Sequence, residues 1–222
     1  MNRLVPTTDG SHTVESSQYG VSYHSKYGAI QESMHVFIDA GLRVAGIGKK
    51  KLAVLEAGFG TGLNALMAFI ESTRHGWEIQ YTGLEAYPLQ PDITTQLNFT
   101  EILNLPELQP VFSRMHETPW NEVAQIAPGF ELTKMQMRFE DVRFEVAFDV
   151  IFFDAFAPTA QPELWGEAVL GNMFRALKPG GILTTYCAKG AVKRQLRALG
   201  FEIESIPGPP GKREMTRARK PK

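Results

Sequence analysis

Short apolar runs and longer helical repeats alternate along the chain. The runs at 51–58, 78–86 and 148–156 are continuous enough to predict buried strands, and polar or turn-forming residues bound each of them. Apolar residues at helical spacing over 63–75 and 191–199 predict helices that bury one face. Strands that alternate with helices predict an α/β fold with a mostly parallel sheet covered by helices on both faces.

The other segments extend this pattern, with one exception. Residues 104–129 contain four prolines and few periodic signals, so we expect a loop with a short helix there. The "GPPG" turn joins two alternating runs near the C-terminus, which predicts an antiparallel strand at that end of the sheet. The further predicted elements are helices at 91–103 and 162–177 and strands at 130–141, 182–188, 201–207 and 213–219.

Chain length sets the number of domains that we expect. The chain has 222 residues, of which 43% are apolar and 21% charged, and this is enough for one full hydrophobic core with little left for a second. We therefore expect a single fold in two parts. An N-terminal extension and helix at 1–45 packs on a main domain at 46–222.

Several protein classes are disfavoured by what the sequence lacks. The first ten residues contain no apolar signal segment, and no stretch approaches the roughly 18 apolar residues of a membrane-spanning helix. These features predict a soluble, cytoplasmic protein without membrane contact. The lone cysteine, Cys187, has no partner for an internal disulfide, and the five histidines show no metal-ligand spacing, so we expect no metal.

Charge is distributed unevenly along the chain. The net charge is −1, but residues 1–188 carry 13 Lys and Arg against 21 Asp and Glu, whereas residues 189–222 carry 10 against 3. The body is thus acidic, at −8, and the C-terminal strip is basic, at +7. One interpretation is a solvated surface helix and tail, and the other is a contact for phosphate groups.

A glycine-rich loop follows the first predicted buried strand. Gly58, Gly60 and Gly62 stand between this strand and a helix, which is the context of a nucleotide-binding loop. The spacing is G-x-G-x-G, because Leu63 stands where the dinucleotide fingerprint has its third glycine. Glu56 precedes the loop, and an acidic rim suits a cationic ligand better than a pyrophosphate. A tight strand-to-helix turn without a ligand remains the alternative.

Three more acidic residues stand at predicted strand ends. Glu85 closes the second strand, where an acid can accept hydrogen bonds from both hydroxyls of a ribose. Asp141 closes the third strand, where it can accept from an adenine amine, and Asp154 closes the fourth. Each acid alone is also typical of a helix cap or a turn. Together with Glu56 they favour a site for an adenosine that carries positive charge, as S-adenosylmethionine does.

Several motifs resemble those of one enzyme family. "EAGFGTGLN", "FDAFAPTAQPELW", "LKPGG", "GPPGKREM" and "YGAIQESMHVF" are similar to segments of the methyltransferases that finish 5-methylaminomethyl-2-thiouridine at the tRNA wobble position. The resemblance covers roughly residues 19–219 and implies a Rossmann-like, S-adenosylmethionine-dependent fold. Some members are fused to an FAD-dependent oxidase, whose nucleotide fingerprint this sequence lacks. We therefore expect a stand-alone enzyme without FAD, which depends on a separate enzyme or pathway for its aminomethyl substrate.

The resemblance also implies roles for individual residues. Asp154 and Phe156, in "DAFAP", would face the incoming amine, and Glu32 would belong to the active-site wall. Fused members commonly have glycine after the aspartate, whereas this chain has Ala155. The residues implied in cofactor binding are Gly58, Gly60 and Gly62 near the methionine part, Glu85 at the ribose and Asp141 at the adenine.

The expected reaction is methyl transfer to an amine. An alkylamine has a pKa of about 10.4 and is mostly protonated at neutral pH, so it needs a group that accepts its proton. Asp154 is our candidate for this general base.

The basic strip and the "GKREM" match favour tRNA as the partner, with Lys212 and Arg213 contacting phosphate groups. Two alternatives remain at this point. One is an N-methyltransferase or aminopropyltransferase-like enzyme acting on a small amine, and the other is a non-catalytic module that only binds the cofactor.

Overall fold

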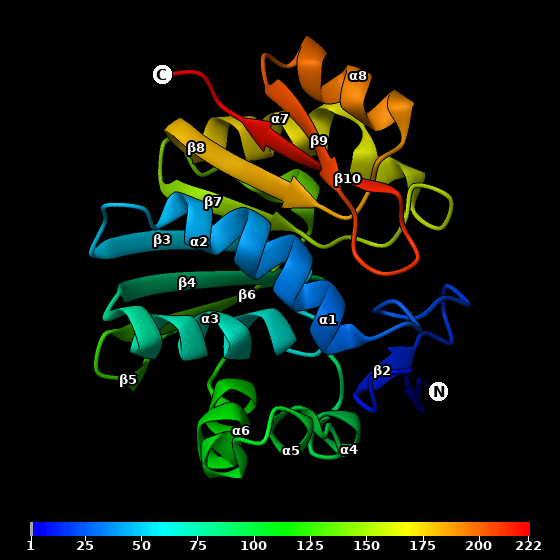
Figure 1. Cartoon of the computed structure of the whole chain (residues 1–222), viewed down its shortest axis with the longest axis vertical. Helices are drawn as coiled ribbons and strands as arrows, with labels where there is room; N and C mark the ends of the chain where they lie inside the picture. Colours follow the sequence, from blue (N-terminus) through cyan, green and yellow to red (C-terminus); the bar gives the residue numbers. More distant parts are fainter. Residues whose placement is uncertain (1) are drawn as a thin grey trace.

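A central sheet organises the structure, a computed structural model that describes residues 2–222. Within these residues the sheet has eight strands in the order β5-β6-β4-β3-β7-β8-β10-β9 (Figure 1). Five of them, β3, β4, β6, β7 and β8, run parallel. The strands are β3 Lys51–Ala57, β4 Glu78–Glu85, β5 Val123–Ala127, β6 Phe130–Gln136, β7 Phe148–Phe153, β8 Leu177–Thr185, β9 Glu202–Pro207 and β10 Glu214–Arg219.

Antiparallel strands lie at both edges of the sheet. β5 pairs antiparallel with β6, and β10 pairs antiparallel with both β8 and β9. The predicted α/β class, the mostly parallel sheet and the antiparallel C-terminal strand are therefore confirmed.

Helices cover both faces of the sheet because successive side chains of a strand point to opposite faces. Val54 and Phe152 pack on one side against η1 and α3, which lie in front of the sheet in Figure 1. Their neighbours Leu55 and Phe153 pack on the other side against α7 and α8. These helices are α1 Ala29–Ser33, which continues into η1 Met34–Leu42 and α2 Arg43–Ala45, then α3 Leu63–His75, α7 Glu167–Ala176 and α8 Gly190–Ala198.

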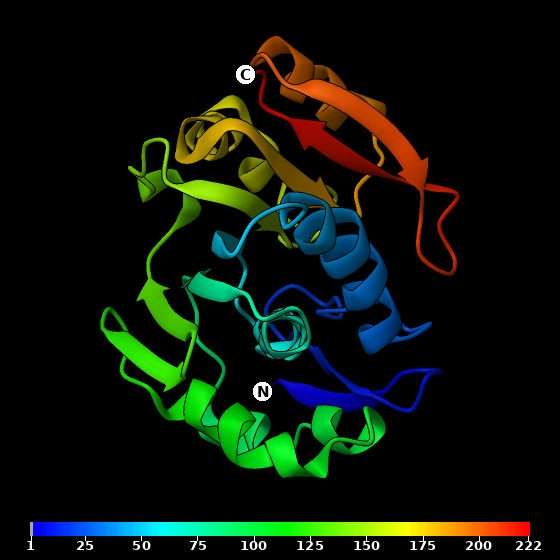
Figure 2. The same cartoon turned by 60° about the vertical axis from the view of Figure 1, so that its left-hand side comes forward.

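The N-terminal residues form a hairpin outside the main sheet. β1 and β2 pair with each other, and Figure 2 shows this hairpin beside the helices α4 to α6. Asn98 joins the two parts, because its side chain accepts a bond from the His12 N–H and donates one to the Gly10 carbonyl. The elements of this region are β1 Arg3–Pro6, β2 His12–Glu15, α4 Pro91–Thr94, α5 Phe99–Ile102, η2 Pro106–Leu108 and α6 Gln109–Glu117.

Three predicted elements were wrong. Residues 104–129 hold β5 as well as helix α6, and β5 escaped prediction because only Ile126 of this edge strand is buried. The single helix predicted at 91–103 is split into α4 and α5. The strand predicted to end at Asp141 ends at Gln136, and Asp141 lies in a short turn of helix, η3 Phe139–Asp141.

Candidate active site

The glycine loop is shaped by contacts within the chain. Gly58 has a φ of +102°, and a Cβ there would lie 2.6 Å from the backbone oxygen of Asp154, so only glycine fits. At Gly60 a Cβ would lie 3.0 Å from the Tyr23 ring. The amides of Gly58 and Phe59 both donate to the Leu84 carbonyl. The loop is therefore locked between the ends of β4 and β7, and its bare backbone faces a cavity.

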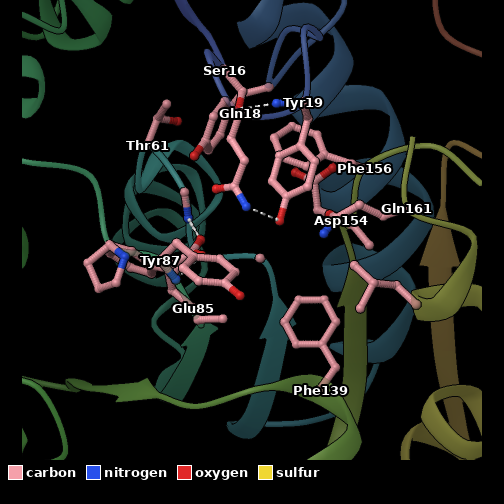
Figure 3. Close-up of a pocket in the computed structure, with 18 of the residues that line it drawn as sticks. Ser16, Gln18, Tyr19, Thr61, Glu85, Tyr87, Phe139, Asp154, Phe156 and Gln161 are labelled. Carbon is pink, nitrogen blue, oxygen red and sulfur yellow. Dashed lines mark hydrogen bonds between the residues drawn. The ribbon is translucent and has the colours of Figure 1, made fainter. Parts of the chain in front are cut away.

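This cavity, of about 560 Å³, lies at the carboxyl ends of the parallel strands. Ligands of open α/β sheets bind at this edge. In Figure 3, Asp154 and Phe156 line one side of the cavity and Glu85 and Tyr87 the other, with Phe139 below. Residues of the N-terminal segment, among them Gln18 and Tyr19, also line the cavity. The sheet thus supplies the floor of the cavity and the N-terminal segment part of its wall.

The structure brings together most of the residues predicted from the sequence. The predicted residues that line the cavity are Glu56, Gly58, Gly60, Glu85, Asp154 and Phe156. Gly62 does not line it and instead stands at the start of α3, against the ring of His116. Asp141 is exposed, and its neighbours Phe139 and Glu140 line the cavity in its place. Asn172 on α7 holds this turn by donating to the carbonyls of Phe139 and Glu140.

Glu85 is held by the backbone around it. One carboxylate oxygen accepts the Gly60 N–H at 3.1 Å, and the other accepts the Tyr87 N–H at 2.9 Å. Burial raises the pKa of Glu85, although these backbone bonds act in the opposite direction. Because each oxygen has further lone pairs, the carboxylate can accept two more hydrogen bonds from a ligand in the cavity.

Asp154 follows β7 directly and reaches the cavity next to the glycine loop. Burial, and then the nearby negative charge of Glu32, raises the pKa of Asp154 to about 8, against the smaller effects of the Asn64 side chain and Lys212. At neutral pH this carboxyl group is therefore mostly protonated when no ligand is bound. A cation entering the cavity favours the carboxylate and lowers its pKa.

We expect Asp154→Asn to stabilise the fold, increasingly so at higher pH. The pKa of Asp154 is about 8 in the folded chain and about 4 in an unfolded one. Between these values only the folded state holds the proton, so wild-type stability falls as the pH rises through this range. Thermal melts between pH 6 and pH 9 should show the melting temperature of the variant rising relative to that of the wild type.

Asp149, at the other end of β7, provides the matched control. Burial alone would raise its pKa, but bonds from Lys49, the Ala53 N–H and Lys178 outweigh that effect and hold the pKa below its usual value. The stabilisation from Asp149 is thus present above pH 4 or so and is lost only as the pH falls through the lowered value. Asp149→Asn should destabilise the fold at neutral pH. A difference in melting temperature between Asp154→Asn and wild type that stays constant from pH 6 to 9 would contradict the raised pKa of Asp154.

Glu56 faces inward from β3 and does not form an exposed acidic rim. The Tyr81 hydroxyl donates to its Oε2 at 2.8 Å, and the Asn64 side chain donates to its Oε1 at 2.8 Å. Burial, and then the proximity of Asp154, raises the pKa of Glu56 well above its usual value. Our sequence reasoning missed Asn64 and Tyr81. An asparagine at the start of an otherwise apolar helix was the available signal.

Buried Glu32 forms an ion pair with half-buried Lys212 beside Asp154. The Lys212 ammonium donates to Glu32 Oε1 at 2.6 Å and lies 4.0 Å from the centre of the Tyr186 ring. The Ser25 N–H donates to the second oxygen of Glu32. The ion pair joins the C-terminal hairpin to the N-terminal helix. Lys212 is therefore engaged within the protein, whereas Arg213 is exposed.

Much of the basic C-terminal strip is neutralised in the same way. Lys193 is buried and pairs with Glu214, whereas Arg194 and Arg197 on the same helix are exposed. Arg217 pairs with Glu204. The strip thus provides fewer exposed cations than its composition indicates, and these include Arg194, Arg197 and Arg213.

Aromatic rings close the cavity around Phe156. Its ring centre lies 5.3 Å from that of Tyr19, which Figure 3 shows beside it. The ring centre of Tyr23 lies 5.0 Å away. Both tyrosines belong to the N-terminal segment, and neither was among the site residues predicted from the sequence. Within residues 2–222, no group of three or more His, Cys, Asp or Glu side chains is arranged to hold a metal ion.

Comparison with known proteins identifies the family. The family model described as S-adenosyl-L-methionine-dependent methyltransferase matches residues 106–221. The chain belongs to this family. The matched part of the methyltransferase includes Asp154 and the "GKREM" motif, while the glycine loop lies before it. The enzyme class implied by the motif resemblance is therefore confirmed.

Several curated relatives of the methyltransferase share one name. Over 98% of its length, the chain is 31% identical to the tRNA 5-methylaminomethyl-2-thiouridine biosynthesis bifunctional protein MnmC of Aromatoleum aromaticum. Over 90% of its length, it is 30% identical to the MnmC of Chromobacterium violaceum. The chain spans about a third of the length of these relatives, 35% and 32% respectively. The family resemblance predicted from the motifs is confirmed.

Solved structures agree with the fold. All of the methyltransferase superposes on 72% of the MnmC2 crystal structure from Aquifex aeolicus, with a TM-score of 0.76 and 26% identity. A Burkholderia thailandensis N1-methyltransferase bound to S-adenosylhomocysteine has a TM-score of 0.52 at 17% identity, which supports the fold alone. Among the helices within residues 2–222, none of those found has the length and apolar character needed to span a bilayer.

Proposed function

We propose that this chain transfers a methyl group from S-adenosylmethionine to the amine of 5-aminomethyl-(2-thio)uridine at the tRNA wobble position. The observation that carries the proposal is the placement of Asp154. Its carboxyl group reaches the same cavity as the glycine loop and Glu85, with its pKa raised to about 8. The names of the MnmC relatives support the substrate.

The cavity residues fit a cationic adenosine cofactor. Three acids with raised pKa values, Glu56, Glu85 and Asp154, line the cavity, and a bound cation would favour their ionised forms. Glu85 has free lone pairs for the ribose hydroxyls, and Gly58 and Gly60 present bare backbone to the methionine part. Phe139 and Glu140 stand where we had expected Asp141 to meet the adenine. When bound, S-adenosylmethionine supplies a methyl group that is already activated by the sulfonium.

The protein itself contributes a proton acceptor and a site that excludes water from the substrate amine. The substrate amine arrives mostly as an ammonium ion, with a pKa of about 10.4. Asp154 attracts this ammonium, accepts one of its protons and leaves a lone pair on nitrogen. The raised pKa of Asp154 makes it a stronger base than an exposed carboxylate. The rings of Phe156, Tyr19 and Tyr23 exclude water from the amine.

We propose that tRNA is held in part by exposed cations of the C-terminal strip. Arg213→Ala should weaken tRNA binding and lower the log-log salt slope by somewhat under one unit, because one phosphate contact is lost. Filter binding across a salt series measures both quantities. Lys51→Ala is the charge-matched control, since Lys51 is exposed at the amino end of β3, away from the cavity. Equal slopes for Arg213→Ala and wild type would remove Arg213 from the interface.

Lys212→Ala is a less direct test of the same surface. Its loss would also leave Glu32 without its cation, next to Asp154. We therefore expect a change in methyl transfer in addition to any change in tRNA binding.

We further propose that the chain binds S-adenosylmethionine without added metal or flavin. In this proposal it performs methyl transfer only, and a separate enzyme or pathway supplies the aminomethyl uridine. A tRNA substrate also places the reaction in the cytoplasm.

A transfer assay tests the proposed function. The purified protein is incubated with methyl-labelled S-adenosylmethionine and tRNA that carries aminomethyl uridine, and matched reactions contain the same tRNA without the aminomethyl group or a small polyamine. Label in the first reaction alone is the expected result. Label in the polyamine would favour the small-amine enzyme, and cofactor binding without any transfer would favour a non-catalytic module.

A further inference from the structure

One buried amide connects the two innermost acids of the cavity. Asn64 lies in the first turn of α3 and is 2% exposed. Its amide nitrogen donates to Glu56 Oε1 at 2.8 Å and to Asp154 Oδ2 at 3.0 Å. Both donors of the amide group are thus directed at carboxyl groups, one from β3 and one from the end of β7.

The hydroxyl of Ser33 sets the orientation of this amide. Ser33, at the end of α1, is buried, and it donates to the Asn64 oxygen at 2.5 Å. An amide turned by 180° would place its oxygen against both carboxyl groups and its nitrogen against the hydroxyl. An ionised carboxylate can only accept, so the observed orientation, in which Ser33 donates to the amide oxygen, is the one that gives both acids a donor.

The hydrogen bonds of Asn64 occupy one carboxyl oxygen of Asp154 and leave the other without a bond. Glu56 has both oxygens occupied, by Asn64 and by the Tyr81 hydroxyl. Asp154 receives a bond from Asn64 on Oδ2, and within residues 2–222 no side-chain or backbone donor bonds its Oδ1. Asp154 lines the cavity, so Oδ1 is the oxygen available to a ligand.

We propose that Asn64, oriented by Ser33, is the positioning residue for Asp154: it holds Oδ2 so that Oδ1 faces the substrate amine. This inference rests on the proposed function. In the step that it supports, an N–H bond of the substrate ammonium breaks, its proton forms an O–H bond with Oδ1, and the electron pair stays on nitrogen. Asn64 keeps its own protons throughout. Burial raises the pKa values of Glu56 and Asp154, and the bonds from Asn64 oppose that effect at both acids.

Ser33→Ala tests the inference because it removes the orienting bond and leaves Asn64 in place. We expect kcat for methyl transfer to fall about tenfold, the effect of one hydrogen bond, with little change in KM for tRNA. The pH–rate profile should shift to higher pH, because a loosened donor stabilises the Asp154 carboxylate less. Ser72→Ala is the matched control: it also removes a buried hydroxyl bond, to the Phe69 carbonyl, but at the far end of α3. It should leave kcat and the profile unchanged.

A measurement that needs no activity separates this inference from the proposed function. Carbon-13 NMR titration of the Asp154 carboxyl, assigned by its loss in Asp154→Asn, should give a higher pKa in Ser33→Ala than in wild type or Ser72→Ala. In wild type the side-chain amide resonances of Asn64 should titrate together with Asp154, which tests the contact even if Ser33→Ala does not fold. Coincident titrations in Ser33→Ala and wild type, or Asn64 resonances that ignore Asp154, would overturn the inference. An inactive wild type with the predicted titrations would instead refute the proposed function.

Discussion

Asp154→Asn is expected to lower methyl transfer by about two to four orders of magnitude, the usual range for a lost general base. Asparagine keeps the size of the side chain and an oxygen for the Asn64 donor, but it cannot accept a proton from the substrate ammonium. Affinity for S-adenosylmethionine should change little, because Glu85 and the loop backbone are untouched. Single-turnover rates on aminomethyl tRNA, combined with titration calorimetry of the cofactor, measure the two effects separately.

The pH dependence adds a second test of Asp154. The rate of the wild type should fall at low pH because a protonated Asp154 cannot accept a proton from the substrate ammonium. Asp149→Asn should show the same profile because Asp149 lies at the opposite end of β7. A fast Asp154→Asn enzyme with a wild-type profile would mean that the carboxyl group is structural.

Glu85→Ala should weaken binding of S-adenosylmethionine at least tenfold. Hydrogen bonds to a charged group contribute roughly 1.5 to 3 kcal/mol, and about 1.4 kcal/mol is a factor of ten in affinity. The backbone donors of Gly60 and Tyr87 would also lose their acceptor. Titration calorimetry measures the change directly.

Glu163→Ala is the charge-matched control for this measurement. Glu163 is an exposed acid at the cavity rim, so its removal changes the same charge without removing a strand-end contact. Its cofactor affinity should stay close to that of the wild type. Equal affinities of Glu85→Ala and wild type would remove Glu85 from the cofactor site.

The sheet was predictable where strands are buried on both faces. β3 and β7 are continuous apolar runs because Val54 and Leu55, or Phe152 and Phe153, pack against helices on opposite sides. The edge strand β5 has no such run, since solvent covers most of it. The hairpin of β1 and β2 depends on contacts with Asn98, more than 80 residues away, which local patterns do not contain.

The candidate site was predictable to a similar extent. Glu85 and Asp154 stand at the ends of strands that the apolar pattern delimits well. Asp141 was misplaced because the strand before it ends at Gln136, where the chain turns into a short helix.

Partners from distant parts of the chain could not be predicted at all. Lys212 appeared from the sequence as a free cation, and its bond to Glu32 spans 180 residues. The orientation of Asn64 depends in the same way on Ser33, a residue of another helix. Spacing along the sequence carries no information on such pairs.

Nucleoside mass spectrometry of tRNA from cells with and without the gene tests the proposed methyl transfer inside the cell. We expect the deletion to accumulate 5-aminomethyl-2-thiouridine, or its form without sulfur, at the wobble position and to lose the methylated product. Restoring the wild-type gene should reverse the change, while the Asp154→Asn gene should not. An unchanged wobble-nucleoside profile in the deletion would contradict the proposed function.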